Sequence, residues 1–503
     1  MGGPMRLMTR RQFALRTGQL VGAAAVTSQL EWLAACGKAA PKQAQWRALA
    51  RRLRGSLVLP GDESYARLRL PFNRRYASVH PSGIAMCAGQ SDVRQALEWS
   101  QEHDVPIAAR SGGHSYAGYS TTPGLVIDVS RLNTVQVNEA DGTISVGGGA
   151  RNTDVYDGLQ PHNVAISAGR CPSVGISGLA LGGGFGFSSR KLGLTSDHLL
   201  ETRLVLASGK RVTCSARENS DLFWACRGGG GGNFGINTAF RFATHPVGRV
   251  SIYDLAWDWR DASEVAPALQ TVLLHAPDEL SMRLGMGKAG GGPQAHRAPP
   301  KMTALGQYFG PPDALTELLR PALRAAPTTK RLIAARTFWQ AKDYFFHTTP
   351  RDQFMEKSSY IIKPLSDRGF QTMMRWVERW PGSLNEDGGS MALFGWGGAI
   401  NRVPAPETAF VHRDAIFLMA YATEWTERDT RASVAAGLDW IEGFFAAMKP
   451  HVAARSYQNF IDSRLPNWES AYYGQNLERL IQVKRRFDPG DRFHFAQSIP
   501  TRG

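Results

Sequence analysis

The chain combines an ordinary globular composition with a strong positive charge. It has 503 residues, of which 43% are hydrophobic and 20% are charged, and its formal net charge is +15 at pH 7. At roughly one domain per 150 residues, this length predicts two or three structural units and excludes a small single module. The densest basic run, "RALARRLRG" from Arg47 to Gly55, is more typical of an amphipathic helix near an anionic membrane than of a nucleic-acid site. We therefore expect no nucleic-acid partner.

The first 36 residues are predicted to be an export signal. Paired arginines in "TRRQF" (Thr9 to Phe13) precede a small, apolar stretch, a pattern that resembles a twin-arginine leader, which exports folded proteins. The leader ends in "LAACG", which resembles a lipobox acylated at Cys36; a plain leader with an incidental cysteine is the alternative. We expect export by the twin-arginine route, to the periplasm, to a lipid anchor at the membrane, or outside the cell. Residues 37–60 are predicted to be a linker.

The next segments predict alternating strands, helices and turns. "SLVLPGDESYARLR" indicates a strand and then a helix, and "SDVRQALEWSQEHDVP" predicts a helix with Ser91 as its N-cap and a proline stop. "IAARSGGHSYAG" indicates a strand that enters a glycine turn. "VQVNEADGTISVGGG" and "ETRLVLASGKRVTCS" are β-branched runs broken by Asp-Gly or Ser-Gly, which favours hairpins in an α+β fold.

The composition changes at about Pro246. Tryptophan-rich segments such as "YDLAWDW" and "MMRWVERW" follow, with a predicted loop at "GKAGGGPQAHRAPPK", and together they indicate a separate domain. After about Lys449 the chain returns to glycine- and aspartate-punctuated segments. We expect this tail to fold back onto the first domain.

Glycine clusters mark the N-terminal half: "SGGH", "VGGGAR", "LGGGFG" and "RGGGGGNFG". Glycine permits close backbone approach to a ligand, and successive amides form an anion nest suited to a pyrophosphate. Gly230, Gly232 and Gly235 satisfy GxGxxG, but "INTAFRFAT" follows them and predicts a strand where a Rossmann site needs a helix. HExxH, GxSxG and GxxxxGK[ST] are absent from the sequence, so metalloprotease, α/β-hydrolase and P-loop functions have no support.

Five cysteines occur without a CxxC spacing, which argues against a disulfide framework or a structural zinc site, and we expect no metal. Besides Cys36, Cys171 stands out because it lies in a glycine-rich turn, "GRCPSVGISGLALGGGFG". Cys87, Cys214 and Cys226 lack such a context and are predicted to be core residues.

Four segments together resemble the berberine bridge enzyme-like family of FAD-linked oxidases. They are "ARSGGHSYAGYS", "GRCPSVGISGLALGGGFGFSSRKLGLTSDHLLETRLVLASG", "DLFWACRGGGGGNFGI" and "YYGQNLERLIQVKRRFDPGDRFHFAQSI", and the match spans nearly all of the chain after about Gly61. The resemblance implies an α+β fold with a two-part PCMH-type FAD-binding domain over residues 61–245. It also implies a substrate domain over 246–449, with an antiparallel sheet backed by helices, and a returning C-terminal segment over 450–503.

The same resemblance implies FAD bonded covalently to both His114 and Cys171. An imidazole nitrogen and a thiolate are competent nucleophiles, and two bonds would clamp the flavin ring and raise its reduction potential. A capping histidine and an inert cysteine are the structural alternative. Further cofactor-binding residues implied by the resemblance are Arg110, Ser111, Gly112, Gly113, Ser115, Gly175, Gly178, Gly182, Gly183, Gly184, Ile236 and Asn476.

Three more side chains are assigned roles by resemblance. Val174, three residues after the cysteine, implies access for molecular oxygen and hence an oxidase that releases hydrogen peroxide. "SYQNF" matches a motif whose tyrosine takes the hydroxyl proton in alcohol-oxidising relatives, which nominates Tyr457; a purely packing role is the alternative. Tyr116 corresponds to a second active-site tyrosine. A phenol needs a cationic or hydrogen-bonding neighbour to act as a base near pH 7.

The substrate is expected to be a small-molecule alcohol. Carbohydrate-oxidising relatives often carry Gln-x-Asp before the Gly-Gly of the substrate domain, whereas "MALFGWGGAIN" places Ala392 and Phe394 there. The loss of polar anchors argues against a small free sugar and favours a larger, partly aromatic or apolar alcohol, such as a secondary metabolite or its glycoside. Oxidative cyclisation or desaturation, for which no glutamate base can be assigned, and a non-catalytic flavin-binding role are alternatives. We expect a monomer.

Overall fold

The computed structural model describes residues 41–292, 297–346 and 352–502. The predicted export signal, including Cys36, lies outside the described residues. The chain divides into two units, Met1–Ala48 and Leu49–Gly503, and the second contains all the sheets. Helix α2 (Gln43–Arg52) spans the division. Among the described residues, no helix is long and apolar enough to cross a membrane.

The first part of the second unit contains two main sheets. A four-stranded mixed sheet has the order β1-β2-β4-β3, and a five-stranded antiparallel sheet has the order β5-β6-β10-β8-β9. The strands are β1 (Ser56–Val58), β2 (Gly83–Met86), β3 (Ile107–Arg110), β4 (Leu125–Asp128), β5 (Val135–Asn138), β6 (Thr143–Gly147), β8 (Leu199–Val205), β9 (Arg211–Ser215) and β10 (Ile236–Ala243), with the small pair β7 (Val164–Ala165) and β11 (His245–Pro246). The helices are α3 (Tyr65–Leu68), α4 (Gln90–Glu102), α5 (Asn152–Leu159), α6 (Ile176–Leu181), α7 (Ser189–Leu192) and α8 (Ser220–Ala225).

The predicted hairpins form as β5–β6 and β8–β9, and "INTAFRFAT" is strand β10, which supports the rejection of a Rossmann site. The prediction of Ser91 as the N-cap of helix α4 was wrong. α4 begins at Gln90 with Gly89 as its N-cap, so Ser91 lies inside the first turn. The carboxylate of Asp92 instead accepts hydrogen bonds from the amides of Arg54, Gly55 and Ala88, which ties the helix to the preceding loop.

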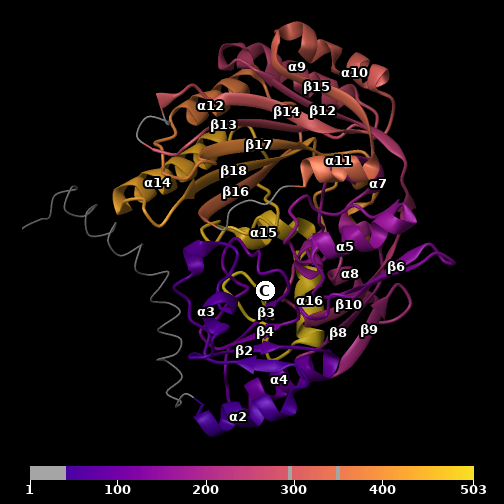
Figure 1. Cartoon of the computed structure of the whole chain (residues 1–503), viewed down its shortest axis with the longest axis vertical. Coiled ribbons are helices and arrows are strands. Elements are labelled where there is room, and N and C mark those ends of the chain that lie inside the picture. Colours follow the sequence, from indigo (N-terminus) through magenta and orange to yellow (C-terminus); the bar gives the residue numbers. More distant parts are fainter. Residues whose placement is uncertain (1–40, 293–296, 347–351, 503) are drawn as a thin grey trace, which may run out of the picture. The chain divides into compact units, whose positions relative to one another are not determined.

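A seven-stranded antiparallel sheet forms the second part, in the order β15-β12-β14-β13-β17-β18-β16. Helices α9, α10, α12 and α14 cover one of its faces (Figure 1). The strands are β12 (Arg249–Trp257), β13 (Arg283–Lys288), β14 (Lys301–Tyr308), β15 (Thr328–Thr337), β16 (Gln353–Ile361), β17 (Gly389–Gly395) and β18 (Phe417–Trp425). The helices are α9 (Ala262–His275), α10 (Pro312–Ala325), α11 (Phe338–Phe345), α12 (Asp367–Glu378), α13 (Ala399–Arg402) and α14 (Arg431–Met448), followed by α15 (Trp468–Tyr473) and α16 (Leu477–Phe487).

The register of this sheet separates its two faces. Successive residues of a strand point to opposite faces, and directly paired residues share a face. Met355, Met391 and Tyr421 belong to the apolar cluster that the helices cover. Their strand neighbours Glu356 and Ala392 therefore lie on the opposite face, which is turned away from α9, α10, α12 and α14 (Figure 1).

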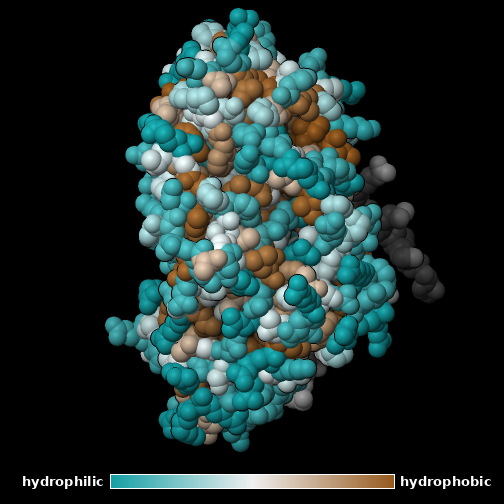
Figure 2. All heavy atoms as spheres, turned by 90° about the vertical axis from the view of Figure 1, so that its right-hand side faces the viewer, coloured by the Kyte–Doolittle hydropathy of each residue, from teal (hydrophilic) through white to brown (hydrophobic). Residues whose placement is uncertain are grey.

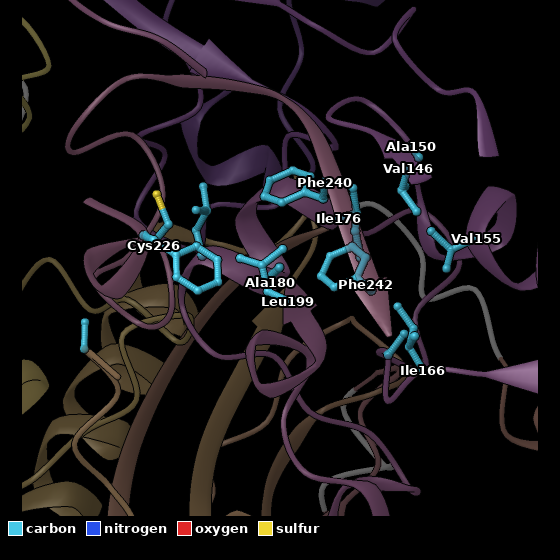
Figure 3. Packing of buried hydrophobic residues seen from close by; sticks show 14 of the residues in the cluster. Val146, Ala150, Val155, Ile166, Ile176, Ala180, Leu199, Cys226, Phe240 and Phe242 are labelled. Atoms are coloured by element: carbon cyan, nitrogen blue, oxygen red, sulfur yellow. The ribbon is translucent and has the colours of Figure 1, made fainter. Parts of the chain in front are cut away.

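A large apolar core fixes the first part. Phe240 and Phe242 of β10 lie beside Ile176 and Ala180 of α6 (Figure 3), within one cluster of buried residues. That cluster also contains Leu480 of α16, so the C-terminal helix packs into the core of the first part. Hydrophilic residues dominate the face of the molecule shown in Figure 2, with hydrophobic residues interspersed among them.

Candidate functional site

The turns that carry His114 and Cys171 pack directly against each other. His114 Nε2 lies 2.9 Å from Ser173 Oγ, two residues after Cys171. A Cβ atom on Gly112 would lie 2.3 Å from the amide nitrogen of Gly175, so only glycine allows this contact between the two backbones. Two segments about 60 residues apart in sequence thus present an imidazole and a thiol to one place.

Each turn is anchored by its own contacts. Arg110, at the end of β3, forms a buried ion pair with Asp128 at the end of β4, with 2.6 Å between Nε and Oδ2. His114 stacks on Phe72 with 3.7 Å between ring centroids. The carbonyl of Cys171 accepts a hydrogen bond from Asn152 Nδ2 at 2.9 Å. These contacts place the two side chains before any ligand binds.

The backbone around the turns fits a cofactor with a pyrophosphate. Among the described residues, the amides of Gly112 and Gly113 donate no hydrogen bond, and Arg110 Nη1 is buried without a partner. A Cβ on Gly178 would meet no atom within 4 Å, so this glycine borders open space. Unpaired donors beside glycine backbone are what an anionic group requires.

Several other predicted cofactor residues make contacts within the protein itself. Ser111 Oγ donates to the Gly148 carbonyl at 2.8 Å, and Ser115 Oγ accepts from the amide of Tyr119. Ile236 is buried at the start of β10. The side-chain nitrogen Nδ2 of Asn476 donates to carbonyls in the loop 405–409. This side chain therefore joins the C-terminal segment to the second part of the fold.

Tyr457 is tied to the glycine loop after α6. Its hydroxyl oxygen accepts hydrogen bonds from the Gly184 amide at 2.9 Å and from Asn459 Nδ2 at 3.1 Å. Gly182 is needed here because a Cβ would collide with the Asn459 side chain. The two donors stabilise a phenolate, but burial dominates and raises the pKa of Tyr457 above its ordinary value. The predicted hydrogen-bonding neighbours are therefore present.

Tyr116 contacts a glutamate that the sequence had not identified. Its hydroxyl faces the carboxylate of Glu356 on β16, which it influences electrostatically, and its ring packs against Phe354 and Phe460. Burial raises the pKa of Glu356 to about 8, although Arg170, Arg283 and the Tyr116 hydroxyl act in the opposite direction. In the sequence, Glu356 stands two residues after Phe354 and two before Ser358, so a strand places all three side chains on one face of the sheet. This spacing does not show which groups pack against that face.

Two arginines and an aromatic wall complete the site. Arg170, directly before Cys171, and Arg283 of β13 lie over the ring of Phe394, with guanidinium carbons 5.8 and 5.7 Å from its centroid. Phe394 also contacts Phe185 and Phe460. Ala392 and Phe394 thus offer no polar anchor for a sugar. The guanidinium of Arg283, on the paired strand β13, lies over the ring of Phe394.

The thiol of Cys171 is not activated by its surroundings alone. Burial raises its pKa, Arg170 lowers it in part, and Glu356 raises it. The other described cysteines, Cys87, Cys214 and Cys226, are buried and unpaired in disulfides. Only Cys171 among these four described cysteines retains partial exposure, which a reactive thiol needs.

Comparisons with known proteins agree on one family. Family models described as FAD binding domain and as Berberine and berberine like match residues 81–215 and 456–500. An uncharacterized FAD-linked oxidoreductase of Bacillus subtilis (strain 168) is 35% identical over 89% of this chain and 97% of its own length. The carbohydrate oxidase of Microdochium nivale is 30% identical over 88% and 92%. The solved structure of Physcomitrella patens BBE-like 1 has a TM-score of 0.83 at 31% identity and covers 91% of this chain and 99% of that one.

Proposed function

The chain belongs to the berberine bridge enzyme-like family of FAD-linked oxidases, and on that basis we propose that it oxidises an alcohol with FAD bonded to both His114 and Cys171. The net reaction converts one alcohol and one O2 into a carbonyl compound and hydrogen peroxide. FAD, when bound, supplies the oxidising chemistry by accepting hydride from the carbinol carbon and passing two electrons to oxygen.

The packing of the His114 turn on the Cys171 turn carries this proposal. A 2.9 Å contact between His114 and Ser173 and the glycine contact between Gly112 and Gly175 bring both nucleophiles within reach of one ring system. The carbohydrate oxidase among the relatives supports an alcohol as the substrate. Val174, which keeps partial exposure beside Cys171, is our candidate for oxygen access.

Tyr457 is the proposed acceptor of the substrate's hydroxyl proton. The Gly184 amide and Asn459 both direct hydrogens at its oxygen, so both would stabilise the phenolate. The proximity of Tyr116 to Glu356 supports a second route, in which the Glu356 carboxylate accepts the proton directly or through Tyr116. This pair would also provide the glutamate base that an oxidative cyclase or desaturase needs.

Export by the twin-arginine route, with or without acylation at Cys36, and a monomeric state remain our proposals for the cellular form. They rest on "TRRQF" and "LAACG" in the sequence. A route that exports folded proteins suits an enzyme loaded with its flavin before export.

The attachment of FAD is tested with the purified protein and its His114→Ala, Cys171→Ala and doubly substituted variants. We expect the wild type and each single variant to keep yellow flavin through denaturation and to show the added mass of FAD, and the double variant to release it. Release from the denatured wild type would disprove the two covalent links. Peroxide release across a panel of alcohols then tests the reaction itself.

A further inference from the structure

Two guanidinium groups converge inside the site, and among the described residues neither forms an ion pair, although the Glu356 carboxyl lies near both. Arg170 comes from the loop that carries Cys171, and Arg283 from the sheet opposite, and both lie over Phe394. Among the described residues, neither guanidinium has a carboxylate oxygen within 4 Å or a hydrogen-bond partner, and Arg283 Nε is buried without one. Both side chains keep partial exposure, so a ligand could reach them, and the buried, unpartnered Nε of Arg283 is a donor that a ligand could satisfy.

The surroundings increase this imbalance of charge. Burial and the neighbouring charge of Arg170 lower the pKa of Arg283 to about 9, which still leaves it charged at neutral pH. Glu356 and Glu424, the acids nearest this face of the sheet, have pKa values raised to about 8 by burial and so are mostly neutral there. Tyr116 and Cys171, which also face Glu356, are uncharged at this pH because burial raises both pKa values.

We propose that Arg170 and Arg283 form a subsite for a carboxylate group on the substrate. This inference rests on the proposed oxidase function and specifies its substrate as an alcohol that also carries a carboxylate. Guanidinium groups bind carboxylates by paired, charge-assisted hydrogen bonds. The aromatic side chains around Phe394 suit an apolar or aromatic body between the carboxylate and the hydroxyl.

The balance of charge favours a carboxylate over a phosphate. Glu356, mostly neutral near pH 7, ionises as the pH approaches its pKa of about 8, and it would then repel a phosphate dianion more strongly than a carboxylate monoanion. The carboxylate takes no part in the reaction. One hydroxy acid and one O2 give one oxo acid and one hydrogen peroxide, with the carbinol hydrogen leaving as hydride and the hydroxyl hydrogen as a proton.

Binding of non-oxidisable probes tests the subsite without relying on turnover. Benzoate and benzamide have nearly the same shape and differ in charge, so each is titrated into the flavin-loaded enzyme by calorimetry. We expect benzoate to bind about tenfold or more tightly than benzamide in the wild type. Arg283→Met and Arg170→Met should remove this preference, and Arg283→Lys should restore part of it. Arg331→Met, on exposed β15, is the matched control and should keep the preference.

Three results would overturn the proposal. Equal affinity of the wild type for acid and amide would show that no anion subsite exists, whatever the variants do. If both methionine variants still bound benzoate more tightly than benzamide to the same degree, the anion would bind at a place other than Arg170 and Arg283. Tighter binding of phenyl phosphate than of benzoate would assign the subsite to phosphate esters. Because the readout is binding, failure of the covalent-flavin or peroxide tests would be seen separately.

Discussion

Desolvation dominates the chemistry of the individual residues at this site. Tyr457 is buried and Glu356 and Tyr116 are partly buried, and desolvation is the largest influence on the pKa of each. The direction is the same for all three, because burial favours the neutral form of an acid. Of these three side chains, Glu356 is the one whose pKa, at about 8, lies near the physiological range, so its charge responds to pH near neutrality.

Replacing Tyr457 by phenylalanine removes one oxygen and leaves the aromatic packing intact. We expect flavin content to be retained and the rate of flavin reduction by substrate to fall about 10²–10⁴-fold, the usual contribution of a proton acceptor. Anaerobic stopped-flow absorbance measures this rate. Tyr360→Phe is the control, since the Tyr360 hydroxyl is buried nearby without a hydrogen-bond partner. A loss confined to Glu356→Gln would instead assign the proton to Glu356.

Glu356→Gln should change how stability depends on pH. Between about pH 4.5 and 8 the folded protein keeps a proton on Glu356 that the unfolded chain has released, so stability falls as pH rises through this window. Glutamine does not titrate, so the variant should gain in melting temperature relative to wild type from pH 5 to pH 8. Thermal unfolding followed by fluorescence tests this, with exposed Glu63→Gln as the control. A constant difference across the range would contradict the raised pKa.

At the scale of elements, two features create the site: paired turns on one side and strand register on the other. The His114 turn follows β3 and the Cys171 turn precedes α6, and glycine contact holds them together. In the facing sheet, Glu356 pairs with Ala422 of β18, and Arg283 pairs with Phe394 of β17. A register slip of one residue would turn Glu356 and Arg283 into the apolar cluster under the helices.

Gly112→Ala should separate the two turns. The added Cβ would lie 2.3 Å from the Gly175 amide nitrogen, and both partners are backbone, so neither can give way cheaply. We expect at least one covalent link to be lost, seen as flavin release after denaturation in the Gly112→Ala, Cys171→Ala double variant. Gly248→Ala is the control, because its Cβ would meet no atom within 4 Å. Full retention of flavin in the double variant would show that the turns tolerate separation.

At the scale of the whole molecule, buried ion pairs and the C-terminal segment join the two parts of the fold. Arg413 pairs with Asp197 through two contacts of 2.7 and 2.8 Å, linking the chain before β18 to the turn before β8. Lys484 of α16 is fully buried, and its Nζ donates to the carbonyl of Asn233 at 2.9 Å. These contacts hold Tyr457 and the sheet face against the turns of the first part.

Arg413→Met should destabilise the protein because it leaves Asp197 buried beside an apolar group. Breaking a buried pair in this way costs about 3–5 kcal/mol. Urea unfolding monitored by tryptophan fluorescence measures the loss. Arg260→Met breaks an exposed pair with Asp258 and should cost less than about 1 kcal/mol. Similar costs for the two variants would mean that the Asp197 pair is effectively solvated.

The family and the α+β fold could be predicted from the sequence alone, and short motifs also nominated His114, Cys171 and Tyr457 as candidates for the site. These are carried by short motifs in which glycine spacing reports local backbone conformation, so they are readable without knowledge of distant contacts. The N-cap at Ser91 was misassigned because α4 begins at Gln90 after Gly89, and glycine offers no side-chain signal for a cap. Tertiary structure alone decided that Glu356 meets Tyr116 and that Arg170 meets Arg283. These pairs depend on the register of a seven-stranded sheet and on burial, and a strand's alternation specifies which residues share a face but not what faces them.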